Sequence, residues 1–345
     1  MPVRTSRLLA AGVAAALAIG LTACATSSND NASDSAGGNP ADDSAFPVTI
    51  EHVYGETTIE SKPERVATVA WANHEVPLAL GIVPVGMSKA TWGDDDDNGI
   101  LPWVEDKLDE LGADAPVLFD ESDGIDYEAV ADTNPDVILA AYSGLTQEEY
   151  DTLSKIAPVV AYPEVAWGTP VDEMIEMNSK ALGLEEQGEA LIEELHADAA
   201  KALDENSALK DKKVLFAYLD PSDLSQVGYY TAVDTRPGYL HDDLGLPLPK
   251  LVEDNEDSDE FSLTVSAEEA DKFDDVDVFV TYGDDSTLAM LQGDPLLSKI
   301  PAVAAGNVVI LPNSTPLAAS ANPSPLSIQW GLSDYLALLA SPFTK

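Results

Sequence analysis

Positive charge is scarce in this sequence. The 345 residues include 17 lysines and arginines against 62 aspartates and glutamates, which gives a net charge of −45 at pH 7. Proteins that bind nucleic acid need basic patches to neutralise phosphates, so this composition excludes nucleic acid as a partner. Cysteine is scarcer still: Cys24 is the only one, and a single thiol cannot form an internal disulfide.

Motifs of catalysis and of metal binding are also missing. The chain has no HxH or HxxxH histidine pair, no glycine-rich phosphate loop and no GxSxG nucleophile motif. The acidic run from Asp94 to Asp97 lacks the spacing of a calcium loop and is interpreted as a solvated loop. We therefore predict a binding protein that is not an enzyme and has no metal site and no resident cofactor. The four histidines are His52, His74, His196 and His241.

One long apolar run is present, and it lies at the N-terminus. Two arginines precede the run from Leu8 to Leu21, which has the length of a signal peptide and is short for a membrane span. The run ends in Leu-Thr-Ala-Cys, which matches the lipobox of bacterial lipoproteins. We predict that residues 1–23 are a lipoprotein signal peptide and that Cys24 carries the lipid. The alternative is a chance cysteine after an ordinary signal peptide.

The segment after Cys24 has no large apolar side chain. Residues 24–45 are mostly small and polar, so they cannot bury enough apolar surface to offset the entropy of folding. We predict a disordered tether that holds the rest of the chain at the extracytoplasmic face of the cell membrane, anchored by lipid alone.

Alternating helical and strand patterns follow the tether. The stretch from Tyr127 to Pro163 predicts helix, strand, helix and strand, and a similar unit spans residues 265–283. Continuous apolar strands between helices are typical of parallel sheets covered on both faces. Each unit places a tyrosine at a strand end, Tyr142 and Tyr282, where α/β folds bind ligands. The alternative is that any two α/β units would look this similar.

The region between these units has no strand pattern. Residues 171–209 carry an apolar stripe at helical spacing, with Gly183 as a possible kink. We predict a connecting helix between an N-terminal α/β lobe, residues 46–170, and a C-terminal α/β lobe, residues 210–345. The alternative is a pair of peripheral amphipathic helices.

Three motifs carry a family resemblance. PERVATVAWANHEVPLALGIVPVG (63–86), EAVADTNPDVILA (128–140) and KIAPVV (155–160) together resemble the substrate-binding lipoproteins of ABC importers for ferric siderophores, haem and cobalamin. The resemblance extends over nearly the whole chain after the tether. It implies two Rossmann-like lobes joined by one long spine helix, a ligand in the cleft between them, a monomeric receptor and an ABC permease as partner.

The resemblance also implies where ligand is bound. A large, partly apolar iron chelate needs aromatic surfaces and a few polar anchors. The candidates lie at strand ends and in the loops beside them, although core packing is the alternative for each. They are Trp92, Tyr142, Trp167, Tyr229, Tyr230, Arg236 and Tyr282.

The scarcity of arginine narrows the ligand class. After the signal peptide the chain has Arg65, which opens a buried strand, and Arg236. Ferric tris-catecholates carry three negative charges and need several cationic groups. We therefore expect iron to arrive within a hydroxamate or mixed siderophore. Haem or a corrinoid is the alternative, with His74, Tyr142 or Tyr230 as axial ligand; a receptor for free metal would need clustered histidines and carboxylates.

Two glutamates are candidates for contact with the permease. In related binders a glutamate on each lobe pairs with arginines of the permease, just before the strand motif of that lobe. The matching positions are Glu128 and Glu268, with Glu269 as the close alternative to Glu268. In a chain this acidic, an ordinary exposed helix acid is the competing interpretation.

Overall fold

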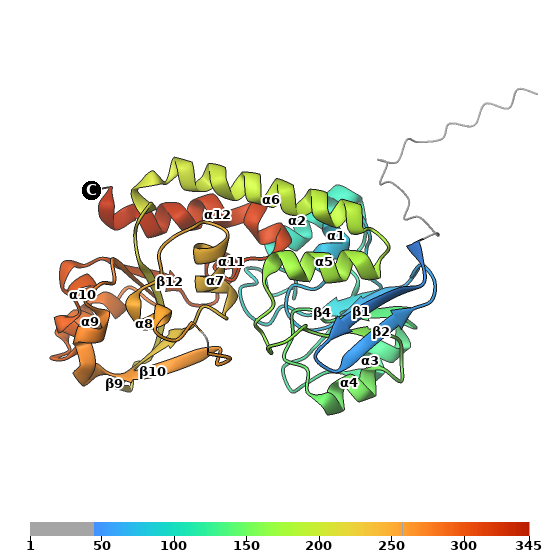
Figure 1. Ribbon diagram of the computed structural model, residues 1–345, viewed down its shortest axis with the longest axis horizontal. Coiled ribbons are helices and arrows are strands. Elements are labelled where there is room, and N and C mark those ends of the chain that lie inside the picture. Colours follow the sequence, from blue (N-terminus) through green and yellow to red (C-terminus); the bar gives the residue numbers. More distant parts are fainter. Residues whose placement is uncertain (1–44, 257, 345) are drawn as a thin grey trace, which may run out of the picture. The chain divides into compact units, whose positions relative to one another are not determined.

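The computed structural model describes residues 45–256 and 258–344, which belong to one compact unit (Figure 1). The predicted signal peptide, Cys24 and the tether up to residue 44 lie outside the described residues. The described part begins with a hairpin, in which β1 (Val48–His52) pairs antiparallel with β2 (Gly55–Ile59). Among the described helices, none is both long enough and apolar enough to cross a membrane.

Two five-stranded sheets form the framework. The first has the order β5-β4-β3-β6-β7, and every neighbouring pair in it is parallel. Its strands are short, and β3, β6 and β7 are fully buried, as expected where helices cover both faces, whereas Val117 of the edge strand β5 is exposed. They are β3 (Val66–Thr68), β4 (Gly86–Ser88), β5 (Val117–Phe119), β6 (Val137–Leu139) and β7 (Val159–Val160).

The second sheet has the order β10-β9-β8-β11-β12 and is mixed. β8, β11 and β12 are parallel, whereas β9 runs antiparallel to both β8 and β10. The predicted α/β fold class is thus confirmed. The second sheet is only partly parallel, because a hairpin joins β8 to β9 where a helical crossover would have joined two parallel strands. The strands are β8 (Val214–Asp220), β9 (Asp223–Tyr230), β10 (Ser262–Ser266), β11 (Val278–Gly283) and β12 (Val308–Pro312).

The two sheets share a repeated core. In each, a first strand pairs with a central strand, and the central strand pairs with a third: β3-β6-β7 in one sheet and β8-β11-β12 in the other. The sequence repeat noticed around Tyr142 and Tyr282 is therefore a structural one, because both residues lie at the carboxyl ends of the central strands.

Helices cover the sheets and begin where the sequence provides caps. In α4 (Gln147–Leu153), the Thr146 hydroxyl accepts a hydrogen bond from the Glu149 amide, and the Glu149 carboxylate accepts one from the Thr146 amide at 2.7 Å.

The other helices of the first lobe are α1 (Glu75–Ala79), α2 (Pro102–Leu111) and α3 (Tyr127–Asp132). Those of the second lobe are α7 (Thr235–Asp242), α8 (Lys250–Glu253), α9 (Thr287–Gly293), α10 (Pro301–Ala305) and α11 (Pro316–Ser320), with short 3₁₀ turns η3 (Ala267–Phe273) and η4 (Leu297–Lys299).

The connector differs from the single helix that we predicted. It consists of α5 (Val171–Ala181) and α6 (Glu185–Glu205), followed by the 3₁₀ turn η2 (Ser207–Leu209). The break falls at Gly183, whose φ of +68° is left-handed and where a Cβ atom would lie 2.6 Å from the Phe46 ring. Gly183 is the residue at which the sequence allowed a kink, and the left-handed backbone turns that kink into a helix end.

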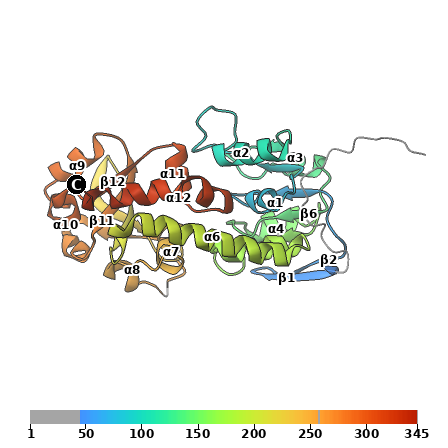
Figure 2. The same ribbon diagram turned by 90° about the horizontal axis from the view of Figure 1, so that it is seen from above.

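A C-terminal helix reinforces the connector. α12 (Pro325–Ala340) packs along α6 and also contacts α1 and α2 of the first lobe (Figures 1 and 2). Its first turn is tied to that lobe, because the buried Glu75 carboxylate accepts hydrogen bonds from the Leu326 amide at 2.9 Å and from Trp103 Nε1 at 2.7 Å. The chain therefore connects the two sheets twice, and one apolar cluster includes residues of both sheets and of α5, α6 and α12.

Candidate ligand-binding site

The loop after β6 places Tyr142 at a strand end. Asn73, in the loop after β3, accepts a hydrogen bond from the Tyr142 amide at 3.0 Å and donates one to the Tyr142 carbonyl at 2.8 Å. Gly144 lets Trp167 approach closely, since a Cβ atom there would lie 2.1 Å from Trp167 Nε1. The Trp167 ring meets the Tyr142 ring edge-on, with centroids 5.5 Å apart, and is 38% exposed.

Arg236 is the charged centre of the second lobe's contribution. Its guanidinium donates to both carboxylate oxygens of the fully buried Asp234, at 2.8 and 2.6 Å, and to the Tyr282 hydroxyl at 3.3 Å. It also lies 3.7 Å from the centroid of the Tyr230 ring, a cation–π distance. Burial alone would lower the pKa of Arg236, but the hydrogen bonds and charge of Asp234 raise it well above its usual value.

Four aromatic rings surround this guanidinium, and we call them the aromatic wall. The centroid of the Phe216 ring, in β8, lies 5.7 Å from that of Tyr230 and 5.4 Å from that of Tyr282. The centroids of the Phe261 and Tyr230 rings are 5.4 Å apart. We did not predict Phe216 or Phe261 from the sequence. Phe216 looks like an ordinary core residue of an apolar strand, and Phe261 lies in an acidic stretch with no strand pattern. The wall consists of Phe216, Tyr230, Phe261 and Tyr282.

Residues of the two lobes meet at this wall. The Trp92 ring meets the Tyr282 ring edge-on, with centroids 5.3 Å apart. The Tyr142 hydroxyl lies 3.3 Å from the Thr235 hydroxyl, and Thr235 directly precedes Arg236. Six of the seven predicted binding residues therefore form a connected set: Trp92, Tyr142, Trp167, Tyr230, Arg236 and Tyr282.

Tyr229 is the exception, and its assignment to the cleft is wrong. Its ring is 2% exposed and belongs to the apolar cluster on the other side of β9, where Asn255 donates a hydrogen bond to its hydroxyl at 3.3 Å. Successive side chains of a strand point to opposite faces, so Tyr229 and Tyr230 cannot both face the same site.

A second loop at this edge was missed as a site candidate. Ala70 and Ala72, on either side of Trp71, both have a φ of +62°, which is uncommon outside glycine. Trp71 lies at the carboxyl end of β3, and its Nε1 atom is buried without a hydrogen-bond partner. Strained backbone of this kind is concentrated at functional sites. Positive φ values at alanine leave no signal in a single sequence.

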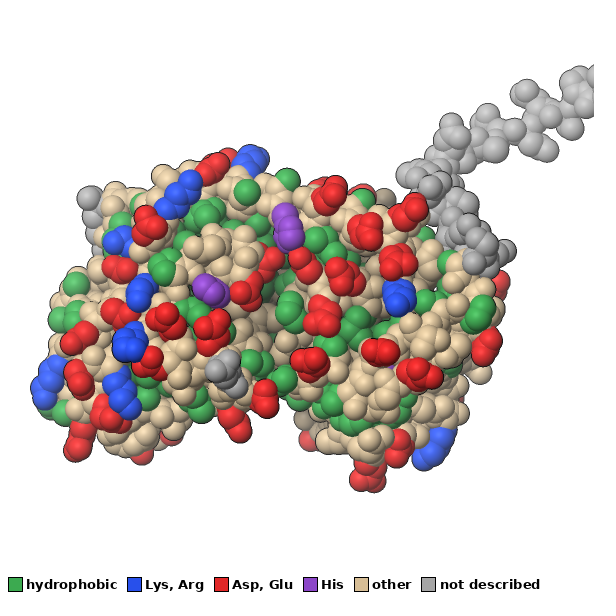
Figure 3. All heavy atoms as spheres, in the orientation of Figure 1, with side chains coloured by type: hydrophobic (Ala, Val, Ile, Leu, Met, Phe, Trp, Pro, Cys, Tyr) green, Lys and Arg blue, Asp and Glu red, His purple; other side chains and the backbone are tan. Residues whose placement is uncertain are grey.

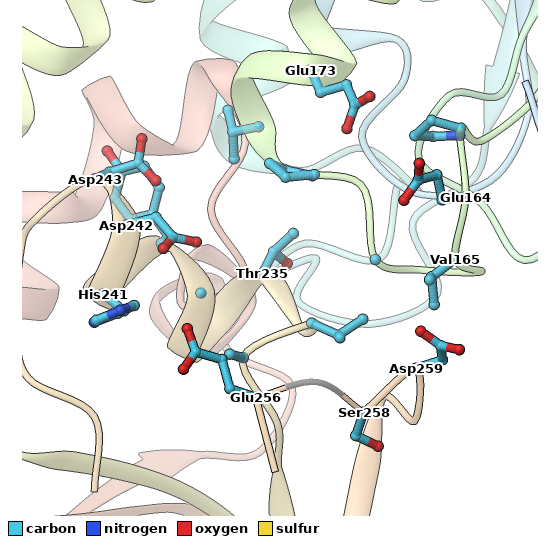
Figure 4. Close-up of a pocket in the computed structure, with 18 residues that line it drawn as sticks. Glu164, Val165, Glu173, Thr235, His241, Asp242, Asp243, Glu256, Ser258 and Asp259 are labelled. Atoms are coloured by element: carbon cyan, nitrogen blue, oxygen red, sulfur yellow. The ribbon is translucent and has the colours of Figure 1, made fainter. Parts of the chain in front are cut away.

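An acidic cavity opens beside Thr235. It has a volume of about 430 Å³ and is bordered by residues 163–171 of the first lobe and by α7 of the second (Figure 4). Among the described residues, no lysine or arginine lines it. Burial and the charges of Glu164 and Glu176 raise the pKa of Glu173. Its carboxylates, several of them labelled in Figure 4, belong to Glu164, Glu173, Asp242, Asp243, Glu256 and Asp259.

Acidic side chains are also spread over the face of the molecule seen in Figure 3, in line with the net charge of −45. Negative charge at the cavity and over this face repels polyanionic ligands, attracts cationic ones and imposes no such penalty on neutral ones.

Comparison with known proteins agrees with this architecture. Residues 66–315 match the periplasmic binding protein family. The chain belongs to that family. A probable siderophore-binding lipoprotein of Bacillus subtilis (strain 168), YfiY, is 30% identical over 250 residues, which cover 69% of this chain and 70% of that protein.

Solved structures place the chain more closely within the periplasmic binding proteins. A crystal structure of PiaA from Streptococcus pneumoniae TIGR4 in complex with ferrichrome has a TM-score of 0.82 and 50% identity, covering 85% of this chain and 98% of that one. A second PiaA structure, described as an iron uptake ABC transporter substrate-binding protein, has a TM-score of 0.79 and 49% identity, covering 86% and 99%. These relatives are binding proteins, which confirms the prediction that the chain is not an enzyme.

The residues suggested for docking to a permease lie outside the aromatic wall. Glu128 is exposed on α3, directly before the central strand β6, and Glu268 is exposed on η3, directly before the central strand β11. Glu269 forms an ion pair with Lys272 at 3.0 Å. Glu128 and Glu268 thus occupy equivalent places in the repeated core of this periplasmic binding protein.

Proposed function

We propose that this protein is the extracytoplasmic receptor of an iron–siderophore ABC importer and that it binds a ferric hydroxamate or mixed siderophore between its two lobes. The observation that carries the proposal is the aromatic wall with Trp92, Tyr142 and Trp167 facing it from the other lobe. The relation to PiaA supports the ligand class, since PiaA has been crystallised with ferrichrome at 50% identity to this chain.

The charges near the wall argue for a hydroxamate over a tris-catecholate. Arg236 supplies the one guanidinium there. The Asp234 carboxylate already neutralises its charge, with Asp234 Oδ2 2.6 Å from Arg236 Nη2. A trianionic chelate would therefore meet no uncompensated arginine, and it would approach past the carboxylates of the acidic cavity. Neutral or cationic ferric hydroxamates avoid both costs, and their apolar chains can pack against aromatic rings.

Haem and corrinoids fit the same residues less well. His74 is 6% exposed, and burial lowers its pKa to about 4. The Tyr142 hydroxyl is bonded by Thr235 and Asn322, and Tyr230 lies under Arg236. Each of the side chains that we considered as an axial ligand is therefore engaged or buried.

A ligand panel tests the proposal. The full chain is titrated with ferrichrome, ferrioxamine B, ferric enterobactin, haemin and cobalamin, and Trp fluorescence and the melting temperature are followed. Ferric hydroxamates should quench fluorescence and raise the melting temperature, because a ligand that binds only the native state stabilises it. Tight binding of ferric enterobactin, haemin or cobalamin without binding of either hydroxamate would refute the proposal.

Attachment and delivery complete the proposed role. Cleavage before Cys24 and its lipidation would anchor the receptor to the cell membrane, as expected from the lipobox and from the lipoprotein relative in Bacillus subtilis. The receptor would act as a monomer and dock on its permease through Glu128 and Glu268, one on each lobe. Iron enters this scheme as part of the bound chelate, so no further cofactor is needed.

A further inference from the structure

Three side chains from distant segments meet where the connector touches the second lobe. Asp172 lies in the first turn of α5, His196 lies on α6, and Asp243 follows the last residue of α7. His196 Nε2 is 2.8 Å from Asp172 Oδ2 and 3.3 Å from Asp243 Oδ1. One donor atom from each of the three lies within 4.8 Å of the others.

This geometry fits a metal better than it fits hydrogen bonding alone. A ring Nε2 carries at most one hydrogen, so it cannot make full hydrogen bonds to two carboxylates at once. Around a tetrahedral Zn²⁺ with bonds of about 2.0–2.1 Å, neighbouring donor atoms lie roughly 3.3 Å apart. The 3.3 Å separation from Asp243 matches that spacing, and the 2.8 Å separation from Asp172 is shorter by about half an ångström, which a side-chain rotation absorbs.

We propose that Asp172, His196 and Asp243 form a binding site for a divalent transition metal, with Zn²⁺ as the best match. One imidazole and two carboxylates are a donor set that zinc accepts, whereas Ca²⁺ and Mg²⁺ prefer oxygen ligands alone. Three protein ligands leave a fourth position for water.

A buried tyrosine beside the cluster supports the site independently. Tyr239, on α7, is 5% exposed, and its hydroxyl is buried without a hydrogen-bond partner. Burial raises the pKa of Tyr239, and the charges of Asp243 and then of Asp172 raise it further. A metal-bound water would give this hydroxyl the partner that it lacks.

The acidic cavity provides access to the metal. Tyr239 and Asp243 both line it, and Asp242 and Asp243 lie at the same end of the cavity in Figure 4. The spacing of histidines along the chain could not reveal the site, because the three ligands come from segments that only the fold brings together.

A metal there would hold α7 against the connector. α7 begins with Thr235 and Arg236, which belong to the proposed ligand site, and Asp243 caps its C-terminal end. The site would thus couple the helix that presents Arg236 to α5 and α6, without being part of the aromatic wall itself.

Calorimetric titration of the metal-stripped full chain with ZnCl₂ tests the proposal, with CaCl₂ in excess to occupy sites made of oxygen ligands alone. The wild type should bind Zn²⁺, and His196→Ala and Asp243→Asn should each bind it at least about tenfold more weakly. The matched controls are His241→Ala and Asp242→Asn, which remove the same kinds of group from neighbouring positions of α7 and should bind Zn²⁺ as the wild type does.

Melting temperature gives a second readout that does not depend on siderophore binding. Zn²⁺ should raise the melting temperature of the wild type and of both controls, and it should not do so for His196→Ala. Circular dichroism without metal checks that each variant folds. Absence of Zn²⁺ binding by the wild type, or equal binding by His196→Ala, Asp243→Asn and the wild type, would overturn the proposal.

Discussion

Arg236 shows how a single residue is kept in place at this site. The sequence drew attention to it because arginine is rare, but its surroundings come from the fold: Asp234 is 0% exposed, and the Arg236 side chain is 12% exposed. A buried ion pair of this kind adds little net stability compared with apolar side chains, yet removing one partner leaves an uncompensated charge. The pair therefore orients the guanidinium against Tyr230. Replacing either residue alone should destabilise the fold, because the other would be left as an unpaired buried charge.

This leads to a prediction about stability. Asp234→Asn keeps the side-chain acceptor that caps α7 at the Arg236 amide and removes the charge, so it should lower the free energy of unfolding by about 3 kcal/mol. Arg236→Met should cost a similar amount, because it strands the Asp234 carboxylate. The double variant should lose clearly less than the sum of the two. Urea unfolding of the four proteins measures this, and additive losses would show that the two residues do not act as a pair.

Strand β9 places two adjacent tyrosines on opposite faces of the sheet. Tyr229 and Tyr230 are identical neighbours in sequence, but one fills the core behind the sheet and the other stacks under Arg236. Their pairing partners in β10 are Leu263 and Ser262, so the alternation continues across the β9–β10 pair. Only the burial of one face of the strand decides which tyrosine is available to a ligand.

Substitution of the two tyrosines should separate binding from stability. Tyr230→Ala removes an aromatic surface from the wall and should weaken binding of ferrichrome or ferrioxamine B by about tenfold or more, with a small loss of stability. Tyr229→Ala leaves a cavity in the core and should cost about 3–5 kcal/mol of unfolding free energy, while the folded fraction binds as the wild type does. Fluorescence titration and urea unfolding of both variants provide the comparison, and the reverse pattern would contradict the assignment of faces.

At the scale of the whole molecule, the lobes are tied together at several places. α6 and α12 run alongside each other from one lobe to the other (Figure 2). Glu75 holds the start of α12, and the Gly93 amide donates a hydrogen bond to the Ser314 hydroxyl at 3.3 Å. Two helical connections oppose wide opening more strongly than one flexible hinge would. The lobe boundaries at residues 170 and 210 stay predictions, as does the role of the exposed glutamates in docking.

That role can be tested by transport. The double variant Glu128→Ala/Glu268→Ala should leave siderophore affinity unchanged, because neither side chain belongs to the aromatic wall, and should reduce iron uptake by cells about tenfold through the loss of charge pairs with the permease. Glu148→Ala, an exposed acid on α4, is the matched control and should leave uptake unchanged. Glu269→Ala tests the alternative docking residue. A drop in the affinity of the purified double variant would rule out a role confined to docking.

Much of the site was predictable because it lies where local patterns are strong. Tyr142 follows the apolar strand β6 and Tyr282 lies in the last two residues of β11, the matching strand of the repeat, and ligands of α/β folds bind at such strand ends. Phe216, Phe261 and the positive φ values beside Trp71 were not predictable, because nothing in the neighbouring sequence distinguishes them from core or loop residues.

The sequence by itself determined the alternation of helices and strands, the repeat, the kink at Gly183 and the lack of positive charge, because periodicity, turn residues and composition act over a few neighbouring positions. The tertiary structure decided which face of β9 meets the ligand, which rings enclose Arg236, and that Asp172, His196 and Asp243 lie together. Those outcomes depend on which distant segments pack against each other, and packing is a property of the folded chain as a whole.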